Sequence, residues 1–246
     1  MFSLYLKEIR SFLSSLIGYI AISVFISLIG IFMWILPSES GGYNVLDNGF
    51  ANIDPLFFIA PWVYLFLIPA ITMRSFSEEK KSGTIEFLLT KPLSDSKIVW
   101  AKYLAGLSLV VVSLLPTLIY YYSVHSLGAP KGNLDSGGTW GSYIGLLFLG
   151  AGFVAIGLFS SSIAENQVIA FIIAMLLCFF MYTGFDYIAD SGVLGGTAAF
   201  FKSLGINDHY LSMSRGVMDT RDVLYFISMI FFFNLFTKLV LESRKW

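Results

Sequence analysis

The chain has 246 residues, of which 57% are hydrophobic and 13% are charged, and its formal net charge is −1. Soluble domains average about 25% charged residues, so this composition excludes an ordinary soluble protein and places the chain in a lipid bilayer. The near-neutral net charge does not by itself identify a binding partner. We expect no nucleic-acid binding.

The first part of the chain, residues 1–15, is a predicted amphipathic helix. Apolar residues recur at i, i+3, i+4 and i+7 from Phe2 onwards, whereas Lys7, Glu8 and Arg10 lie on other faces. Charged side chains are costly in hydrocarbon. We therefore favour a helix that lies in the cytosolic interface over a ragged extension of the first membrane span.

Six later segments can cross a membrane, since a span needs roughly 20 apolar residues. With both termini in the cytosol, eleven Lys and Arg lie inside and four lie in outer loops, which satisfies the positive-inside rule. The sequence predicts an all-α integral membrane fold with six transmembrane helices over residues 16–241 and a cytosolic tail, 242–246. The predicted spans are residues 17–36, 55–73, 103–124, 142–163, 168–188 and 223–241.

Polar and helix-breaking residues inside the spans are few. Pro61 and Pro69 should kink the second span and Pro116 the third, with neighbouring helices satisfying the freed carbonyls. Asn234 is the one strongly polar residue deep in a span, and a helix–helix hydrogen bond is favoured over a role as substrate ligand. Carboxylates are nearly absent from mid-membrane, which argues against an ion-driven transporter.

Small residues recur four apart in the fourth span, at Gly141 and Gly145 and again at Ala151 and Ala155. This spacing lets helices approach closely. A seam between subunits or along a lumen and simple packing within one subunit remain equally open.

The sequence shows no catalytic machinery. It has no G-x-x-x-x-G-K-[ST] phosphate loop, and two distant histidines with one cysteine make a metal site or a nucleophilic triad implausible. We expect no enzyme activity and no metal or cofactor bound by this chain. No residue stands out as a substrate ligand.

A charged insert, residues 74–102, separates the second and third spans and holds six of the fifteen Lys and Arg. Gly83 should end the helix that leaves the second span, and Thr84 can cap a short helix that follows. Glu86 lies in the first turn of this short helix, where the dipole favours an acid. Pro92 ends it. A surface helix on lipid head groups and a rigid knob that docks in a partner's cleft are equally compatible with these residues.

The run EEKKSGTIEFLLTKPLSDSKIVWAK, residues 78–102, resembles the signature that follows the second span of ABC-2-type permeases. That signature has an acidic–basic pair, Gly-Thr, a hydrophobic residue, Glu, two leucines and Pro, and then a Lys that enters the third span, here Lys102. The resemblance extends over essentially the whole chain. Residues 200–226 are similar to the last outer loop of gliding-motility ABC permease subunits. The predicted outer region is 190–221, and within it residues 197–215 suggest a short re-entrant helix.

The resemblance implies a permease subunit of the cell inner membrane that rests on a cytosolic ABC ATPase, which binds the ATP and Mg. It also implies a second permease subunit, as a homodimer, or a second, larger membrane protein. The short helix after Gly83 would be the coupling helix, and the turn around Glu165 a second, smaller contact. The predicted ATPase-coupling residues are Glu78, Glu79, Gly83, Thr84, Glu86, Leu88, Leu89, Pro92, Glu165 and Asn166.

Two other functions remain open. A non-transporting membrane scaffold that receives a mechanical or assembly signal from an ATPase would share the kinked spans and the paired arrangement. An independent secondary transporter would need ionisable groups along its path, and the spans offer almost none.

Overall fold

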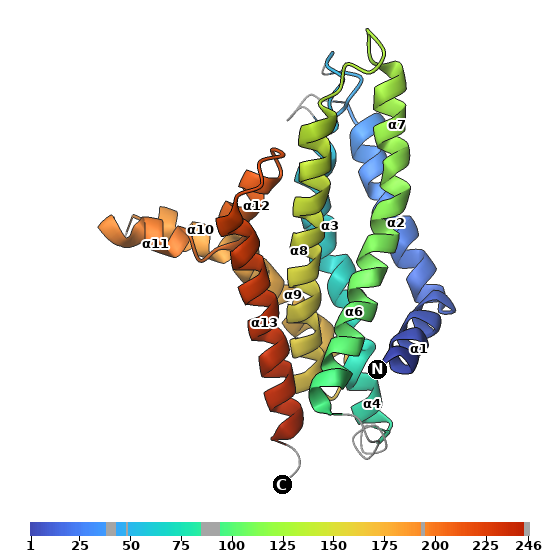
Figure 1. Cartoon of the computed structure of the whole chain (residues 1–246), viewed down its shortest axis with the longest axis vertical. Helices are drawn as coiled ribbons and strands as arrows, with labels where there is room; N and C mark the ends of the chain where they lie inside the picture. Colours follow the sequence, from blue (N-terminus) through green and yellow to red (C-terminus); the bar gives the residue numbers. More distant parts are fainter. Residues whose placement is uncertain (38–42, 48, 85–93, 193–194, 244–246) are drawn as a thin grey trace.

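The computed structural model describes residues 1–37, 43–47, 49–84, 94–192 and 195–243. These residues form an elongated bundle of helices, and the described part of the chain contains no strand. Helices α1 and α4 and the end of α13 lie together at one end of the bundle (Figure 1), which we call the terminal end because the first and last described helices meet it.

Five helical segments are each long and apolar enough to cross a membrane. A sixth candidate is the pair Phe2–Leu13 and Gly18–Trp34, whose two parts are bent by 66°. The prediction of an all-α protein is confirmed, with five spans or with six when the bent pair counts as one. The five segments are Asp54–Lys81, Asp95–Leu127, Ser136–Ile163, Gln167–Asp190 and Thr220–Glu242.

The bend separates α1 (Phe2–Leu13) from α2 (Leu16–Trp34). The Ser15 hydroxyl caps α2 by accepting a hydrogen bond from the Gly18 N–H at 3.2 Å. A Cβ on Gly18 would lie 2.6 Å from the Phe12 carbonyl, so only glycine allows this close turn. The amphipathic segment is thus a helix of its own, and its place in the membrane interface stays a prediction.

Prolines mark the second and third spans. Pro61 and Pro69 lie inside α3, and Pro116 lies in a 3₁₀ turn that interrupts the third span. This interruption follows from the missing N–H of proline, which removes one intrahelical hydrogen bond. The elements are α3 (Asp54–Thr72), α4 (Arg74–Lys81), α6 (Asp95–Leu114), η1 (Leu115–Thr117) and α7 (Leu118–Leu127).

Helix α8 (Ser136–Ile163) is the most buried span and packs against α3, α6, α9 and α13. Its small residues serve packing inside the subunit. A Cβ on Gly141 would meet the backbone of Gly216 at 2.7 Å, and one on Gly145 would meet Met213 at the same distance. The fifth span consists of α9 (Gln167–Phe179), a π-helical turn (Phe180–Gly184) and α10 (Phe185–Asp190).

The chain then leaves the bundle sideways through α10 and α11 and returns through α12 (Figure 1). The expected short helix over 197–215 is divided in two, because Gly205 has an extended backbone that begins a new helix. Asp219 caps the last span by accepting a hydrogen bond from the Arg221 N–H at 2.9 Å. The elements are η3 (Gly195–Thr197), α11 (Ala198–Lys202), α12 (Ile206–Met213) and α13 (Thr220–Glu242).

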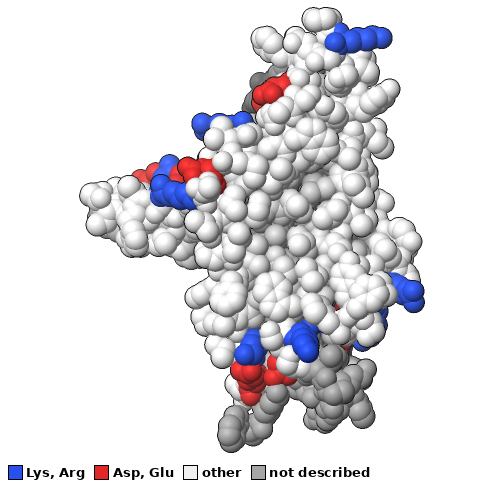
Figure 2. All heavy atoms as spheres, in the orientation of Figure 1, with Lys and Arg blue, Asp and Glu red and all other residues white. Residues whose placement is uncertain are grey.

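Charged side chains gather at the two ends of the bundle and on the projecting α10–α11 arm (Figure 2). In the same view, the surface between the ends is uncharged. Such a belt suits hydrocarbon, since charged groups in the membrane interior are expensive. The distribution agrees with a protein whose long helices cross a membrane.

Candidate functional site

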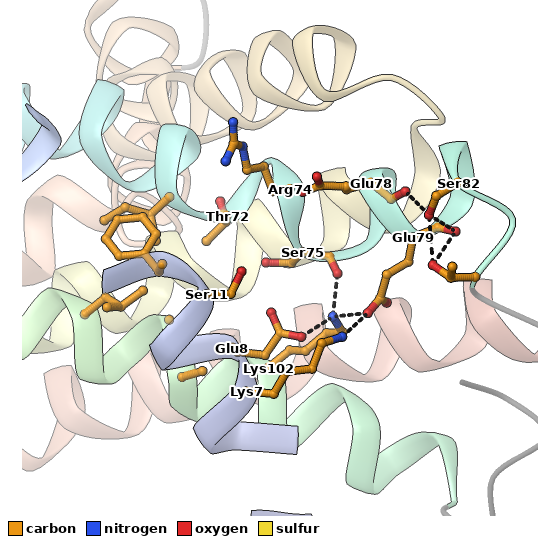
Figure 3. Close-up of a pocket in the computed structure, with 16 residues that line it drawn as sticks. Lys7, Glu8, Ser11, Thr72, Arg74, Ser75, Glu78, Glu79, Ser82 and Lys102 are labelled. Atoms are coloured by element: carbon orange, nitrogen blue, oxygen red, sulfur yellow. Dashed lines mark hydrogen bonds and ion pairs between the residues drawn. The ribbon is translucent and has the colours of Figure 1, made fainter. Parts of the chain in front are cut away.

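A buried cluster of charges joins three helices at the terminal end (Figure 3). Lys102 of α6 lies with its Nζ 2.9 Å from Glu8 Oε1 of α1 and 3.1 Å from Glu79 Oε1 of α4. The Lys102 ammonium also donates to the Ser75 carbonyl at 2.6 Å, and its side chain is 1% exposed. We call Lys102, Glu8 and Glu79 the lysine junction, because one ammonium holds α1, α4 and α6 together.

The junction depends on how α6 begins. Helix α6 starts at Asp95, after the cap position Ser94, so Lys102 lies about 10 Å along the helix at 1.5 Å per residue. There its Nζ is 5.0 Å from the centre of the Phe76 ring of α4, an additional cation–π contact. Further along α6, the hydroxyls of Tyr5 and Ser108 are 2.9 Å apart, so α1 lies against α6 beyond the junction as well.

Electrostatics explains why the lysine can be buried. A desolvated ammonium is strongly unfavourable unless it is paired and hydrogen-bonded, and the two carboxylates and the Ser75 carbonyl meet that need. Glu79 Oε1 is also 3.6 Å from Nζ of Lys7, but Lys7 is largely exposed, so this pair adds little. Glu79 Oε2 is buried and has no hydrogen-bond partner among the described residues.

A cavity of about 290 Å³ lies beside the lysine junction, between α1, the end of α3, α4 and α6. Arg74 and Glu78 line it together with the junction, and Figure 3 shows the Arg74 guanidinium pointing away from Lys102. Its basic and acidic side chains are equal in number, so its charge favours neither an anion nor a cation. The lining charges are Lys7, Arg74, Lys102, Glu8, Glu78 and Glu79.

A second set of contacts fastens α4 to the end of α8. The Ser161 hydroxyl accepts from the N–H groups of Phe76 and Ser77, at 2.9 and 3.1 Å, and donates to the Met73 carbonyl at 2.9 Å. The Lys80 ammonium donates to the Ser162 carbonyl. Because α8 ends at Ile163, these bonds tie α4 to the turn that leads into α9.

The predicted coupling residues that the structure describes lie in two regions, at α4 and in the turn after α8. Glu78, Gly83 and Thr84 are exposed at the end of α4, and the positive φ of Gly83, +69°, suits the glycine that was expected to end this helix. Glu165 and Asn166 are exposed in the turn after α8. Four predicted residues lie outside the described part of the chain, and so does the proposed coupling helix itself: Glu86, Leu88, Leu89 and Pro92.

Two of these residues have a structural role that sequence reasoning missed. Glu79 was expected to face a partner, but its side chain is only 14% exposed and pairs with Lys102 inside the chain. Asn166 caps α9, because its Oδ1 accepts from the Val168 N–H at 2.9 Å. A partner contact of either residue stays a prediction.

Glu8 and Ser161 were not predicted as part of any site. Glu8 was assigned to the polar face of the first helix, although it lies one turn after Leu4, which is buried. Because residues four apart lie on the same face of a helix, this spacing could have indicated that Glu8 faces the protein interior. Ser161 belongs to a run of three serines at the end of a span, which gave no indication of which hydroxyl would face α4.

Asn234 differs from its prediction. Its Nδ2 donates to the Ile230 carbonyl of the same helix at 2.8 Å, and its buried Oδ1 has no partner among the described residues. The expected bond to another helix is therefore wrong within the described chain. A side-chain amide can donate to a carbonyl one turn earlier in its own helix, so its N–H group does not need to reach another helix.

No group of three metal-ligating side chains occurs within the described ranges. His209 instead lies with Nδ1 2.7 Å from Asp222 Oδ1 and Nε2 2.9 Å from the Ser203 carbonyl. Its ring stacks on Tyr225 at 3.9 Å between centres. This cluster fastens α12 to the start of α13.

The chain matches the model of a known family. The model of the family described as "ABC-2 family transporter protein" matches residues 3–242. A search of curated proteins gave no significant match. Permeases of this family are transmembrane components and do not themselves bind nucleotide. Because the match covers nearly the whole chain, this protein belongs to the ABC-2 family of transporter proteins.

Proposed function

We propose that this chain is the permease subunit of an ATP-driven ABC-2 transporter. It would couple ATP hydrolysis by a separate cytosolic ATPase to substrate export, or to mechanical work, across the inner membrane. Family membership carries this proposal, since ABC-2 permeases generally work with a cytosolic ABC ATPase. The second span also continues into α4, which ends at Lys81, within the run 78–102 that resembles the family's signature.

The terminal end of the bundle would face the cytosol. Helices α1 and α4, the start of α6 and the end of α13 carry a concentration of Lys and Arg at this end. Basic residues near span ends are retained on the cytosolic side. Both termini would therefore be cytosolic, and the α10–α11 arm would lie on the outer side.

The lysine junction supports a mechanical route from the ATPase to the spans. A force on residues 85–93 would reach the end of α4, which is held to α1 and α6 through Lys102 and to α8 through Ser161. Buried, closely packed contacts are stiff, so the four helices would move together rather than slide. The exposed turn at Glu165 lies on the same side and would be a second contact.

A second membrane subunit would complete the transporter. Its binding is supported by an apolar groove of about 610 Å³ between α2 and α3, with Trp62 and Phe66 exposed on its wall and Phe171 of α9 at its edge. Aromatic side chains supply large contact area between packed helices. We propose that an identical subunit, or a second, larger membrane protein, packs on this face.

The gliding-motility type is the finer assignment that we propose. It is supported by the likeness of residues 200–226 to the last outer loop of those permease subunits. The structure adds that this loop contains α12, which returns to the bundle and contacts α8 and α13.

The test is reconstitution with the ATPase. Gly83→Pro and Glu86→Lys should leave membrane insertion intact but reduce ATPase co-purification or ATP turnover, because both alter the proposed contact. Lys131→Glu, at the opposite end, is the matched charge control and should change neither. Unchanged co-purification and turnover in both test variants would reject the coupling assignment.

A further inference from the structure

The second span has a backbone carbonyl without its usual donor. Pro61 lies inside α3 and has no N–H, so the Phe57 carbonyl, four residues earlier, loses the intrahelical hydrogen bond that it would otherwise accept. Phe57 is 1% exposed, so water does not reach this region. Within a membrane-spanning helix, such a carbonyl must find a donor inside the protein.

That donor comes from α12, more than 150 residues later in the chain. The Tyr210 hydroxyl donates to the Phe57 carbonyl at 2.7 Å, and Tyr210 is itself 1% exposed. Burial raises the pKa of the Tyr210 hydroxyl well above its ordinary value, so the group keeps its proton over the whole physiological range. The bond is short and enclosed.

Helix α12 is also attached to the last span and to α8. His209 pairs with Asp222 of α13, and the Ser142 hydroxyl of α8 donates to the Ser214 carbonyl at 2.8 Å, just after α12. Through Tyr210, α12 is bonded to α3 as well. The helix that α12 reaches through Tyr210 is therefore the same span that ends in α4 and the lysine junction.

We infer that Tyr210 is a positioning residue that occupies the carbonyl freed by Pro61 and thereby docks α12 on α3, so that α12 follows movements of the second span. The docking is independent of what the protein transports. The consequence for transport, a link between the ATPase side and the α12 side through one helix, rests on the proposed function.

Another tyrosine provides a matched comparison. The Tyr120 hydroxyl of α7 donates to the Ile26 carbonyl of α2 at 2.8 Å. Ile26 lies within a regular helix, where the Gly30 N–H is its usual donor, so Tyr120 supplies a second bond to a carbonyl that is already satisfied. Removing the Tyr120 hydroxyl should therefore matter less than removing that of Tyr210.

The experiment is a double-mutant comparison on the purified full chain in lipid nanodiscs. Tyr210→Phe should lower the unfolding midpoint by about 2–4 °C and speed amide hydrogen exchange in residues 206–213. Pro61→Ala restores a backbone N–H at position 61. In that background, Tyr210→Phe should change both quantities much less, because the Phe57 carbonyl again has a donor in its own helix. Tyr120→Phe should leave exchange in 206–213 unchanged.

Equal effects of Tyr210→Phe in both backgrounds would overturn the inference, since the hydroxyl would then serve a partner unrelated to Pro61. Unchanged exchange in the single variant would also overturn it, and that result needs no proline substitution. No ATPase or transport assay enters either measurement. A failure here is therefore distinguishable from a failure of the proposed function.

Discussion

The Lys102 ammonium lies 3.1 Å from the Glu79 carboxylate, and this contact fastens the extension of the second span to the third span. The two residues are 23 positions apart, on either side of the segment proposed to contact the ATPase. Glu8 completes the pairing from the first helix at 2.9 Å. The stretch between Glu79 and Lys102 is therefore anchored at both ends by one buried ion cluster, so these two anchor points cannot move independently.

Removing the charge of Lys102 should destabilise the protein. Lys102→Met keeps most of the apolar stem but leaves Glu8 and Glu79 close together without a cation, and the expected loss is about 3 kcal/mol. For a chain of this size, the unfolding midpoint in detergent should fall by roughly 6–12 °C. Lys97→Met, at an exposed position of the same helix, is the control and should shift it little.

A second substitution tests the origin of that loss. Adding Glu79→Gln to Lys102→Met removes one of the two unpaired carboxylates and should recover part of the stability. If the double variant is no more stable than Lys102→Met alone, repulsion between buried carboxylates is not the cause.

Ser161→Ala should weaken the attachment of α4 to α8. The substitution leaves the Phe76 and Ser77 N–H groups without their acceptor, which should cost about 1–3 kcal/mol in the free energy of unfolding. Ser160→Ala is the matched control, because the Ser160 hydroxyl donates to the Ile156 carbonyl of its own helix. Equal losses in denaturant unfolding of the two variants would contradict the attachment.

Gly157→Ala should disturb the crossing of α3 and α8. A Cβ there would lie 2.1 Å from Thr72 Oγ1, so the helices would have to separate, at an expected cost of about 1–3 kcal/mol. Gly137→Ala, at the exposed start of α8, meets nothing closer than 3.5 Å and should be neutral or slightly stabilising. Thermal unfolding of the two variants provides the comparison, and equal midpoints would show that the crossing has room for a methyl group.

Trp62→Cys should report on the proposed second subunit. The native Cys178 is buried, so an introduced thiol on the groove wall is the reactive one. If identical subunits pack on the α2–α3 face, oxidation should give a disulfide-linked dimer on a gel. Tyr122→Cys, exposed on α7, is the control and should stay monomeric. Crosslinking through the control alone would place the interface elsewhere.

The spans could be predicted from the sequence because they depend on local properties. Apolar length and basic flanks suffice to locate them, and Gly83 acts on the end of the helix that immediately precedes it. The effect of Pro116 is also local, because the missing N–H of a proline interrupts the helix that contains it whatever surrounds that helix.

The lysine junction and the Tyr210 contact could not be predicted in the same way. Lys102 was visible only as the last residue of a family-like signature, and Glu8 as one charge on a polar face. Their pairing depends on the rotation of α1 about its axis and on how α1 packs against α6, and neither is encoded within a single helix. The rule that a freed carbonyl finds a donor was available for Pro61, but the rule does not say which of the thirteen tyrosines supplies it.

Co-purification from native membranes tests the central claim most directly. The tagged chain should be extracted in a gentle detergent and its partners identified by mass spectrometry. The account predicts recovery of an ABC ATPase that is lost with Glu86→Lys and retained with Lys131→Glu. Recovery of the chain alone, under conditions that preserve a known ABC complex, would contradict it.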